Sequence, residues 1–165
     1  MNIQQPKPAR PRRTPVEIAR SFLTDAEAFL LAARTLDESG KVEASAPKYY
    51  LACHSVELIL KAYILTHGGK EAQLREIGHD LTEALSRATE RGLKPKDERT
   101  ETLIEMLAPY HLEHRFRYRR TGYITLPVLD EACEIVDHLI KQIGPEVDQA
   151  MRVEIAAKRA TAGKP

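Results

Sequence analysis

Cysteine, tryptophan and long apolar runs are scarce or missing in this sequence of 165 residues, which has two cysteines and no tryptophan. A chain of this length buries roughly two thirds of its unfolded surface, so its core needs neither disulfides nor a metal ion. Cys53 and Cys133 each fall within an apolar helical repeat, where a small buried thiol is the expected role. No apolar run approaches the roughly 20 residues that span a bilayer, and residues 1–20 lack the apolar centre of a signal peptide. We therefore expect a soluble, cytoplasmic protein.

An excess of charge of one sign is also missing. The sequence has 25 Lys and Arg against 24 Asp and Glu, so its net charge of +1 neither favours nor excludes nucleic acid as a ligand. The basic residues are instead clustered, at residues 7–13 and 115–120. Residues 1–13 have prolines among these basic residues and no apolar periodicity, which predicts a disordered basic arm. Both clusters are places where phosphate could bind.

Strand-like alternation, glycine-rich nucleotide loops and internal repeats are not visible either, which leaves apolar residues at helical spacing as the main structural signal. They predict an all-α, up-and-down bundle of about five helices over residues 14–143, followed by a C-terminal helical extension and tail at 144–165. Thr14 and Asp80 are expected helix caps, with Glu17 completing a capping box at the first. Proline or glycine should end helices near Pro109 and interrupt the last one at residues 144–145, and a cap signal at residues 24–25 offers a break in the first helix.

Residues 49–67 are the stretch around which the rest of the chain is organised. Apolar residues cover most of the circumference of this helix, which predicts that it is central and buried. The polar residues that remain form a single stripe at i, i+4, i+7 and i+11: Tyr50, His54, Glu57 and Lys61. A charged group on a buried helix has to be paired or functional. The structural interpretation is an ordinary ion pair of Glu57 with Lys61 and a satisfied core histidine at position 54.

Residues 110–123 form the one segment without clean periodicity. Basic and aromatic residues alternate between Arg115 and Tyr118, so an extended segment would place Arg115 and Arg117 on the same side. Such a face is suited to phosphate. His111 and His114, three residues apart, could share a metal ion. No cysteine or HExxH-like partner lies nearby, so we expect neither a metal nor a cofactor.

Three short motifs, in this order and spacing, carry a family resemblance: YYxACxSxELxLKAY at residues 49–63, GHDL at 78–81 and RY at 117–118. With them the chain resembles HEPN domains (higher eukaryotes and prokaryotes nucleotide-binding) over roughly residues 15–143. The resemblance implies an all-α up-and-down bundle that is usually homodimeric. It points to a family of metal-independent ribonucleases, toxins of toxin–antitoxin pairs, and inactive RNA- or nucleotide-binding members.

The ribonucleases of that family carry an arginine separated from a histidine by four to six residues. Histidine moves protons at the RNA 2′-hydroxyl and the leaving oxygen, and arginine holds the phosphate charge. This chain departs from the pattern, since its nearest approach is Arg75 and His79 with only three residues between them. We expect an RNA- or nucleotide-binding protein of a toxin–antitoxin or defence system, with an antitoxin-like partner. A divergent metal-independent endoribonuclease and a purely structural dimerisation or assembly subunit stay open as alternatives.

The candidate site combines polar groups from all three motifs. The expected nucleotide- or phosphate-binding residues are His54, Glu57, Lys61, His79, Arg115, Arg117 and Tyr118. If the chain is an enzyme, His79 and Arg117 are the candidates for catalysis, with His114 as a further proton carrier. Glu57 would orient His79 or Arg117 and leave the other cation for phosphate. The structural alternative is that Glu57 only neutralises Arg117 and ties the basic segment down.

Overall fold

The computed structural model describes residues 12–38, 40, 45–118 and 125–162, and the regular structure within these ranges is entirely helical. The helices are α1 (Pro15–Glu38), α2 (Ser45–Thr66), α3 (Glu71–Ile77), α4 (Leu81–Glu90), α5 (Thr100–Leu112) and α6 (Leu129–Ala162). The prediction of an all-α helical bundle is confirmed, with six helices in the described part of the chain where we expected about five. Residues 1–11 of the predicted arm, and residues 119–120 of the second basic cluster, lie outside the described ranges.

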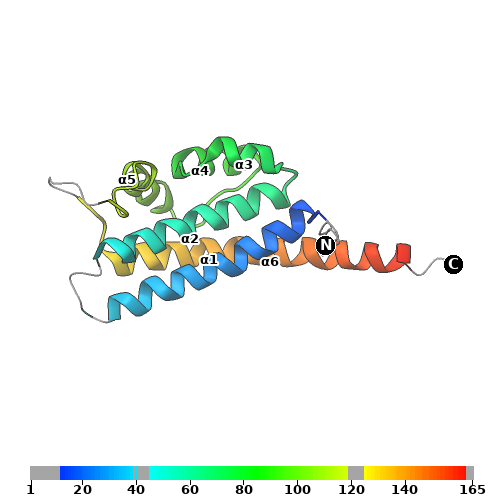
Figure 1. Cartoon of the computed structure of the whole chain (residues 1–165), viewed down its shortest axis with the longest axis horizontal. Coiled ribbons are helices and arrows are strands. Elements are labelled where there is room, and N and C mark those ends of the chain that lie inside the picture. Colours follow the sequence, from blue (N-terminus) through cyan, green and yellow to red (C-terminus); the bar gives the residue numbers. More distant parts are fainter. Residues whose placement is uncertain (1–11, 39, 41–44, 119–124, 163–165) are drawn as a thin grey trace, which may run out of the picture.

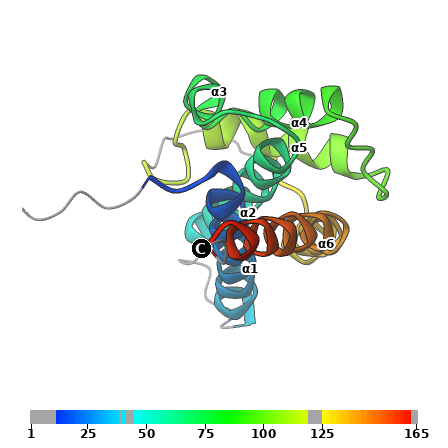
Figure 2. The same ribbon diagram turned by 90° about the vertical axis from the view of Figure 1, so that its right-hand side faces the viewer.

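The helices are arranged around α2. Helices α1, α2 and α6 run beside one another, and α3, α4 and α5 lie across α2 from α1 (Figures 1 and 2). Helix α2 therefore contacts α1, α4, α5 and α6. The C-terminal part of α6 continues beyond the other helices (Figure 1). Among the described residues, no helix combines the length and the apolar character that crossing a membrane requires.

Helix α2 is the centre of the core, as its sequence predicted. Every residue from Ser55 to Leu65 is buried. Each leucine or isoleucine among them stabilises the fold by about 1.5–3 kcal/mol relative to an exposed position. Cys53 of α2 and Cys133 of α6 are free, buried thiols, also as predicted. The same burial takes the charged side chains of Glu57 and Lys61 out of water.

The end predicted near Pro109 and the interruption predicted at residues 144–145 were wrong, and the possible break at residues 24–25 does not occur. Helix α1 is continuous through residues 24–25, α5 continues past Pro109 to Leu112, and α6 passes through Pro145 without interruption. A proline inside a helix costs about 3 kcal/mol, because it removes a hydrogen bond and crowds the preceding turn. In α6 the buried residues Ile143, Gly144 and Val147 flank Pro145, and we attribute the continuity of the helix to this packing. The division of the chain at residues 143/144 stays a prediction.

The predicted caps are present. The Glu17 backbone N–H donates to Thr14 Oγ1 at 3.2 Å and the Thr14 backbone N–H donates to Glu17 Oε2 at 2.8 Å, which is a capping box. At the start of α4, Asp80 Oδ1 accepts hydrogen bonds from the backbone N–H groups of residues 82 and 83. The second cap fixes the short turn between α3 and α4, and this turn carries His79.

Candidate functional site

The candidate site is centred on the carboxylate of Glu57, a residue that is only 3% exposed. One carboxylate oxygen, Oε1, accepts a hydrogen bond from Lys61 Nζ at 2.6 Å. The other, Oε2, lies 3.0 Å from His79 Nδ1, 2.7 Å from His111 Nε2 and 3.7 Å from His54 Nδ1. Glu57 therefore connects α2 to the α3–α4 turn and to α5. We call these five residues the Glu57 cluster.

The α3–α4 turn is held against the cluster at a second point. Lys61 Nζ also donates to the backbone oxygen of Gly78 at 2.6 Å. Gly78 ends α3 with a φ of 57°, a conformation that residues with a side chain rarely adopt. The sharp turn at Gly78 lets its carbonyl oxygen accept a hydrogen bond from Lys61 while the imidazole of the next residue, His79, contacts Glu57.

Electrostatics fix the protonation states at the centre of the cluster. Burial by itself would raise the pKa of Glu57, but the interactions with His111, then His54, His79 and Lys61, outweigh burial and hold this pKa well below its usual range. Burial lowers the pKa of His111, against the opposing effect of Glu57. These shifts favour the carboxylate form of Glu57 and the neutral form of the His111 imidazole, whose Nε2 lies within hydrogen-bonding distance of Glu57 Oε2.

The Glu57 cluster has a more exposed edge, which we call the rim: His79 of the cluster together with Tyr50, His114 and Arg117. Arg117 is exposed. It donates from Nη2 to the Tyr50 hydroxyl at 2.5 Å, and its guanidinium carbon lies 4.9 Å from the centre of the Tyr50 ring. The hydrogen bond to Tyr50 raises the pKa of Arg117 further, so the group is a permanent cation. Within the described ranges no carboxylate forms an ion pair with it.

His114 occupies an unusual backbone conformation at the end of α5. Its φ is 55°, the one positive value at a residue other than glycine in the described part of the chain. The His114 N–H donates to the oxygen of His111 and the Arg115 N–H to that of Tyr110, which are the paired hydrogen bonds of a Schellman motif. Glycine normally occupies this left-handed position, and a side chain there costs about 1 kcal/mol. The His114 ring lies 5.3 Å from that of His79, so a strained residue contributes its imidazole to the rim.

The structure brings together five of the seven residues expected to bind phosphate. His54, Glu57, Lys61 and His79 share one cluster, and Arg117 joins it through Tyr50 rather than through Glu57. The interpretation that Glu57 directly neutralises Arg117 was therefore wrong. The separate structural interpretation was correct for the ion pair of Glu57 with Lys61 but not for a satisfied His54, because its buried Nδ1 has no hydrogen-bond partner among the described residues.

The basic segment is folded differently from our expectation. The N–H groups of Arg117 and Tyr118 both bond to the oxygen of His114, which makes a tight turn in place of an extended strand. Arg115 consequently lies apart from Arg117 and contacts Glu113 Oε2 at 2.6 Å and the Tyr110 ring at 5.6 Å. Tyr118 is 69% exposed. A phosphate face made of both arginines does not form.

Sequence reasoning missed the part that His111 plays. We considered His111 only as a partner of His114, whereas it is 3% exposed and binds Glu57, a residue 54 positions earlier. A signal was available, because His111 continues the buried row of α5 at helical spacing after Ile104, Leu107 and Ala108. A histidine on the buried face of a helix requires a polar partner from another element.

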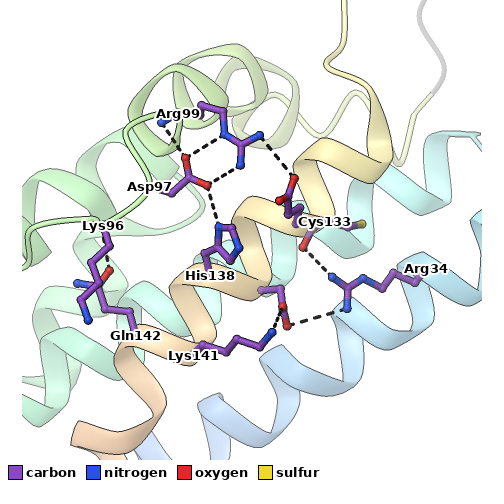
Figure 3. A network of polar contacts seen from close by, with 10 residues as sticks. Arg34, Lys96, Asp97, Arg99, Cys133, His138, Lys141 and Gln142 are labelled. Atoms are coloured by element: carbon purple, nitrogen blue, oxygen red, sulfur yellow. Dashed lines mark hydrogen bonds and ion pairs between the residues drawn. The ribbon is translucent and has the colours of Figure 1, made fainter.

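A second carboxylate–histidine cluster, also missed, lies between the start of α5 and α6 (Figure 3). Asp97 Oδ2 lies 2.8 Å from His138 Nδ1 and 2.7 Å from Arg99 Nη2. We call these three residues the Asp97 cluster. The side chains of His138 and Arg99 are 43% and 47% exposed. The cluster borders a surface hollow of about 530 Å³, which Lys96, Lys141 and Gln142 also line.

Comparison with known proteins gives one match. A family model described as HEPN domain matches residues 19–144. This range takes in both carboxylate–histidine clusters, the rim and all of helices α2 to α5. Searches of curated proteins and of solved structures return no match.

Proposed function

Because this chain belongs to the HEPN domain family, we propose that it is an RNA- or nucleotide-binding protein that holds phosphate at the rim, without turnover. HEPN domains commonly dimerise and bind RNA, and the family suggests a nucleotide- or RNA-related role. The proposal about this particular site rests on the geometry of the rim. Its residues are Tyr50, His79, His114 and Arg117.

The observation that carries the proposal is the state of Arg117. A guanidinium group has five N–H donors in a planar fork that suits phosphate oxygens. In this structure one of its nitrogens bonds to the Tyr50 hydroxyl, and no described carboxylate neutralises the charge. Stacking on the Tyr50 ring orients the group without cancelling its charge. Arg117 is therefore an oriented, exposed cation without a counter-charge among the described residues, which is the kind of group that binds an incoming phosphate.

His79 supplies a second group for the same ligand. Its Nδ1 is held by Glu57, and its side chain is 40% exposed. Because Glu57 holds Nδ1, Nε2 is the ring nitrogen left for a polar contact with a ligand. The exposed ring of Tyr118 follows Arg117 directly and offers a surface on which a base could stack.

The alternative enzyme, a divergent metal-independent endoribonuclease, is favoured by one specific observation. His79 and His114 have ring centres 5.3 Å apart and lie on the same rim as Arg117. Two imidazoles can act as general base and general acid on either side of a phosphate whose charge an arginine stabilises. The arginine–histidine spacing of the family's ribonucleases is missing from this chain, which is why we place binding first.

The biological setting that we propose, a homodimer in a toxin–antitoxin or defence system with an antitoxin-like partner, has its support in the family. Exposed apolar side chains such as Leu31 (67%) and Val128 (62%) could contribute to contacts with another chain. If the rim binds nothing, assembly through such side chains is the remaining function. Light scattering on the purified protein measures the oligomeric state.

The test is incubation of the purified protein with labelled single-stranded RNA and with tRNA in EDTA, following both electrophoretic mobility and cleavage. Arg117→Ala and His79→Ala are compared with wild type, and Arg152→Ala on the exposed side of α6 is the matched control. We expect wild type to retard RNA without cutting it, and Arg117→Ala to bind about tenfold more weakly, a loss of about 1.4 kcal/mol. The control should bind like wild type.

The other outcomes each lead to a different conclusion. Cleavage that is lost in His79→Ala and Arg117→Ala establishes the nuclease. Retardation that Arg152→Ala weakens as much as Arg117→Ala indicates diffuse electrostatic binding and contradicts the rim. Circular dichroism of each variant separates lost binding from lost folding, and a wild-type protein that neither retards nor cleaves RNA refutes the proposal.

A further inference from the structure

We propose that His54, Glu57 and His111 form a binding site for a divalent transition-metal ion inside the bundle. One donor atom of each residue lies within 4.8 Å of the corresponding atoms of the other two. Ligands bound to zinc at 2.0–2.2 Å in tetrahedral geometry are about 3.4 Å apart, so small rotations of the side chains would complete the coordination. The three residues come from α2, the central helix, and from α5.

A buried nitrogen atom provides an independent reason for a ligand at this place. His54 Nδ1 is inaccessible to solvent and has no hydrogen-bond partner among the described residues. Buried polar atoms are nearly always satisfied, so this one requires an explanation. His54 Nδ1 lies 3.7 Å from Glu57 Oε2, which is too long for a hydrogen bond. A metal ion between the imidazoles and the carboxylate would give His54 the partner that the protein itself does not provide.

The carboxylate is already oriented as a ligand to a metal. Lys61 holds Glu57 Oε1 at 2.6 Å, which leaves Oε2 directed toward the imidazoles. Hydrogen bonds of this kind, made by a residue that does not itself touch the metal, fix the orientation of coordinating side chains. His79 Nδ1 also lies 3.0 Å from the same oxygen, but His79 is not among the three residues whose donor atoms lie close together. The fourth position of a tetrahedral site would therefore be open to water or another small ligand.

The donor atoms indicate which ions fit. Imidazole nitrogen with one carboxylate oxygen suits zinc and its neighbours such as cobalt, whereas magnesium and calcium prefer sets made of oxygen. Imidazole groups are concentrated here, because four of the six histidines of the chain lie in the Glu57 cluster or on its rim.

This inference revises our expectation that the chain binds no metal. That expectation weighed His111 together with its neighbour in sequence, His114. The structure instead places His111 beside His54 and Glu57 of α2, which are 57 and 54 positions earlier in the chain, so the relevant donors could not be recognised from local spacing.

The experiment measures metal directly and needs no RNA, so its failure is independent of the proposed binding function. Untagged protein is stripped with EDTA, dialysed, and titrated with Zn²⁺ by calorimetry, with bound zinc counted by mass spectrometry. We expect one zinc per chain with a Kd below about 1 μM. Substitution of zinc by Co²⁺ should produce the visible absorption of a tetrahedral cobalt site.

The variants identify the ligands. His54→Gln, at a position that is partly exposed and thus tolerant, should weaken zinc binding by more than about tenfold, and His111→Gln should do so as well if it folds. His138→Gln is the matched control, because His138 also binds a carboxylate through Nδ1, at 2.8 Å. Absence of zinc binding at 100-fold the expected Kd, or equal loss in His54→Gln and His138→Gln, would overturn the proposal.

Discussion

The Glu57 and Asp97 clusters use the same chemical groups in different surroundings. Each carboxylate accepts from the Nδ1 atom of a histidine, at 3.0 Å for Glu57 and 2.8 Å for Asp97, and each binds a cationic side chain. Lys61, the cation at Glu57, is buried, whereas Arg99, the cation at Asp97, is 47% exposed. The comparison shows that the same types of residue form one cluster with a buried cation and another with an exposed cation.

The two clusters differ in the free energy of their ion pairs because their partners differ in exposure to solvent. Hydrogen bonds, first from Arg99 and then from His138, lower the pKa of Asp97, and water can replace either partner. The pKa of Glu57 is lowered although burial alone would raise it, so the interactions with its partners must offset the free energy of desolvating the carboxylate. Loss of one partner therefore has different consequences in the two clusters.

The largest effect that we predict is on stability. Glu57→Gln should reduce the free energy of unfolding by about 3–5 kcal/mol, because it leaves the ammonium group of Lys61 buried without a counter-charge. Asp97→Asn is the same chemical change in a cluster whose carboxylate side chain is 9% exposed but whose cation, Arg99, is 47% exposed, and it should cost less than about a third as much because water can solvate the released cation. Urea denaturation of both variants measures the two losses. Equal losses would show that burial does not separate the clusters.

The second prediction compares the two arginines in RNA binding. Arg117→Ala should weaken binding about tenfold, or about 1.4 kcal/mol, since it removes a cation that no described carboxylate neutralises. Arg99→Ala removes an arginine already paired with Asp97, and with Glu134 at 3.5 Å, and should change the affinity less than twofold, which is less than about 0.4 kcal/mol. Fluorescence anisotropy with a labelled oligonucleotide measures both. A larger effect of Arg99→Ala than of Arg117→Ala would indicate that RNA binds at the Asp97 cluster.

The smallest predicted effect is that of His114→Gly, which should raise stability and weaken RNA binding. His114→Gly should stabilise the fold by about 0.5–1 kcal/mol, because glycine adopts the left-handed conformation without strain. The same variant should bind RNA more weakly, since it removes an imidazole from the rim. Thermal melting and anisotropy on one preparation test both parts. A variant that loses stability would contradict the assignment of strain to His114.

The sequence predicted those parts of the molecule that depend on local periodicity. The stripe from Tyr50 to Lys61 follows from the 3.6-residue repeat, and the cap at Asp80 follows from local chemistry. The partners of Glu57 were harder to predict, because contacts between α2, α5 and the α3–α4 turn are set by tertiary packing. Pro109 and Pro145 failed as predicted helix ends for the same reason, since packing on either side outweighs a local penalty.

The most direct test of the central claim observes the histidines of both clusters in wild-type protein at once. The imidazole ¹H–¹⁵N signals are assigned by NMR, and a short RNA oligonucleotide is added in EDTA. If phosphate binds at the rim, the signals of His79 and His114 shift in a saturable manner, while that of His138 in the Asp97 cluster stays in place. Shifts at His138 with none at His79 or His114 would contradict the claim that the rim is the binding site.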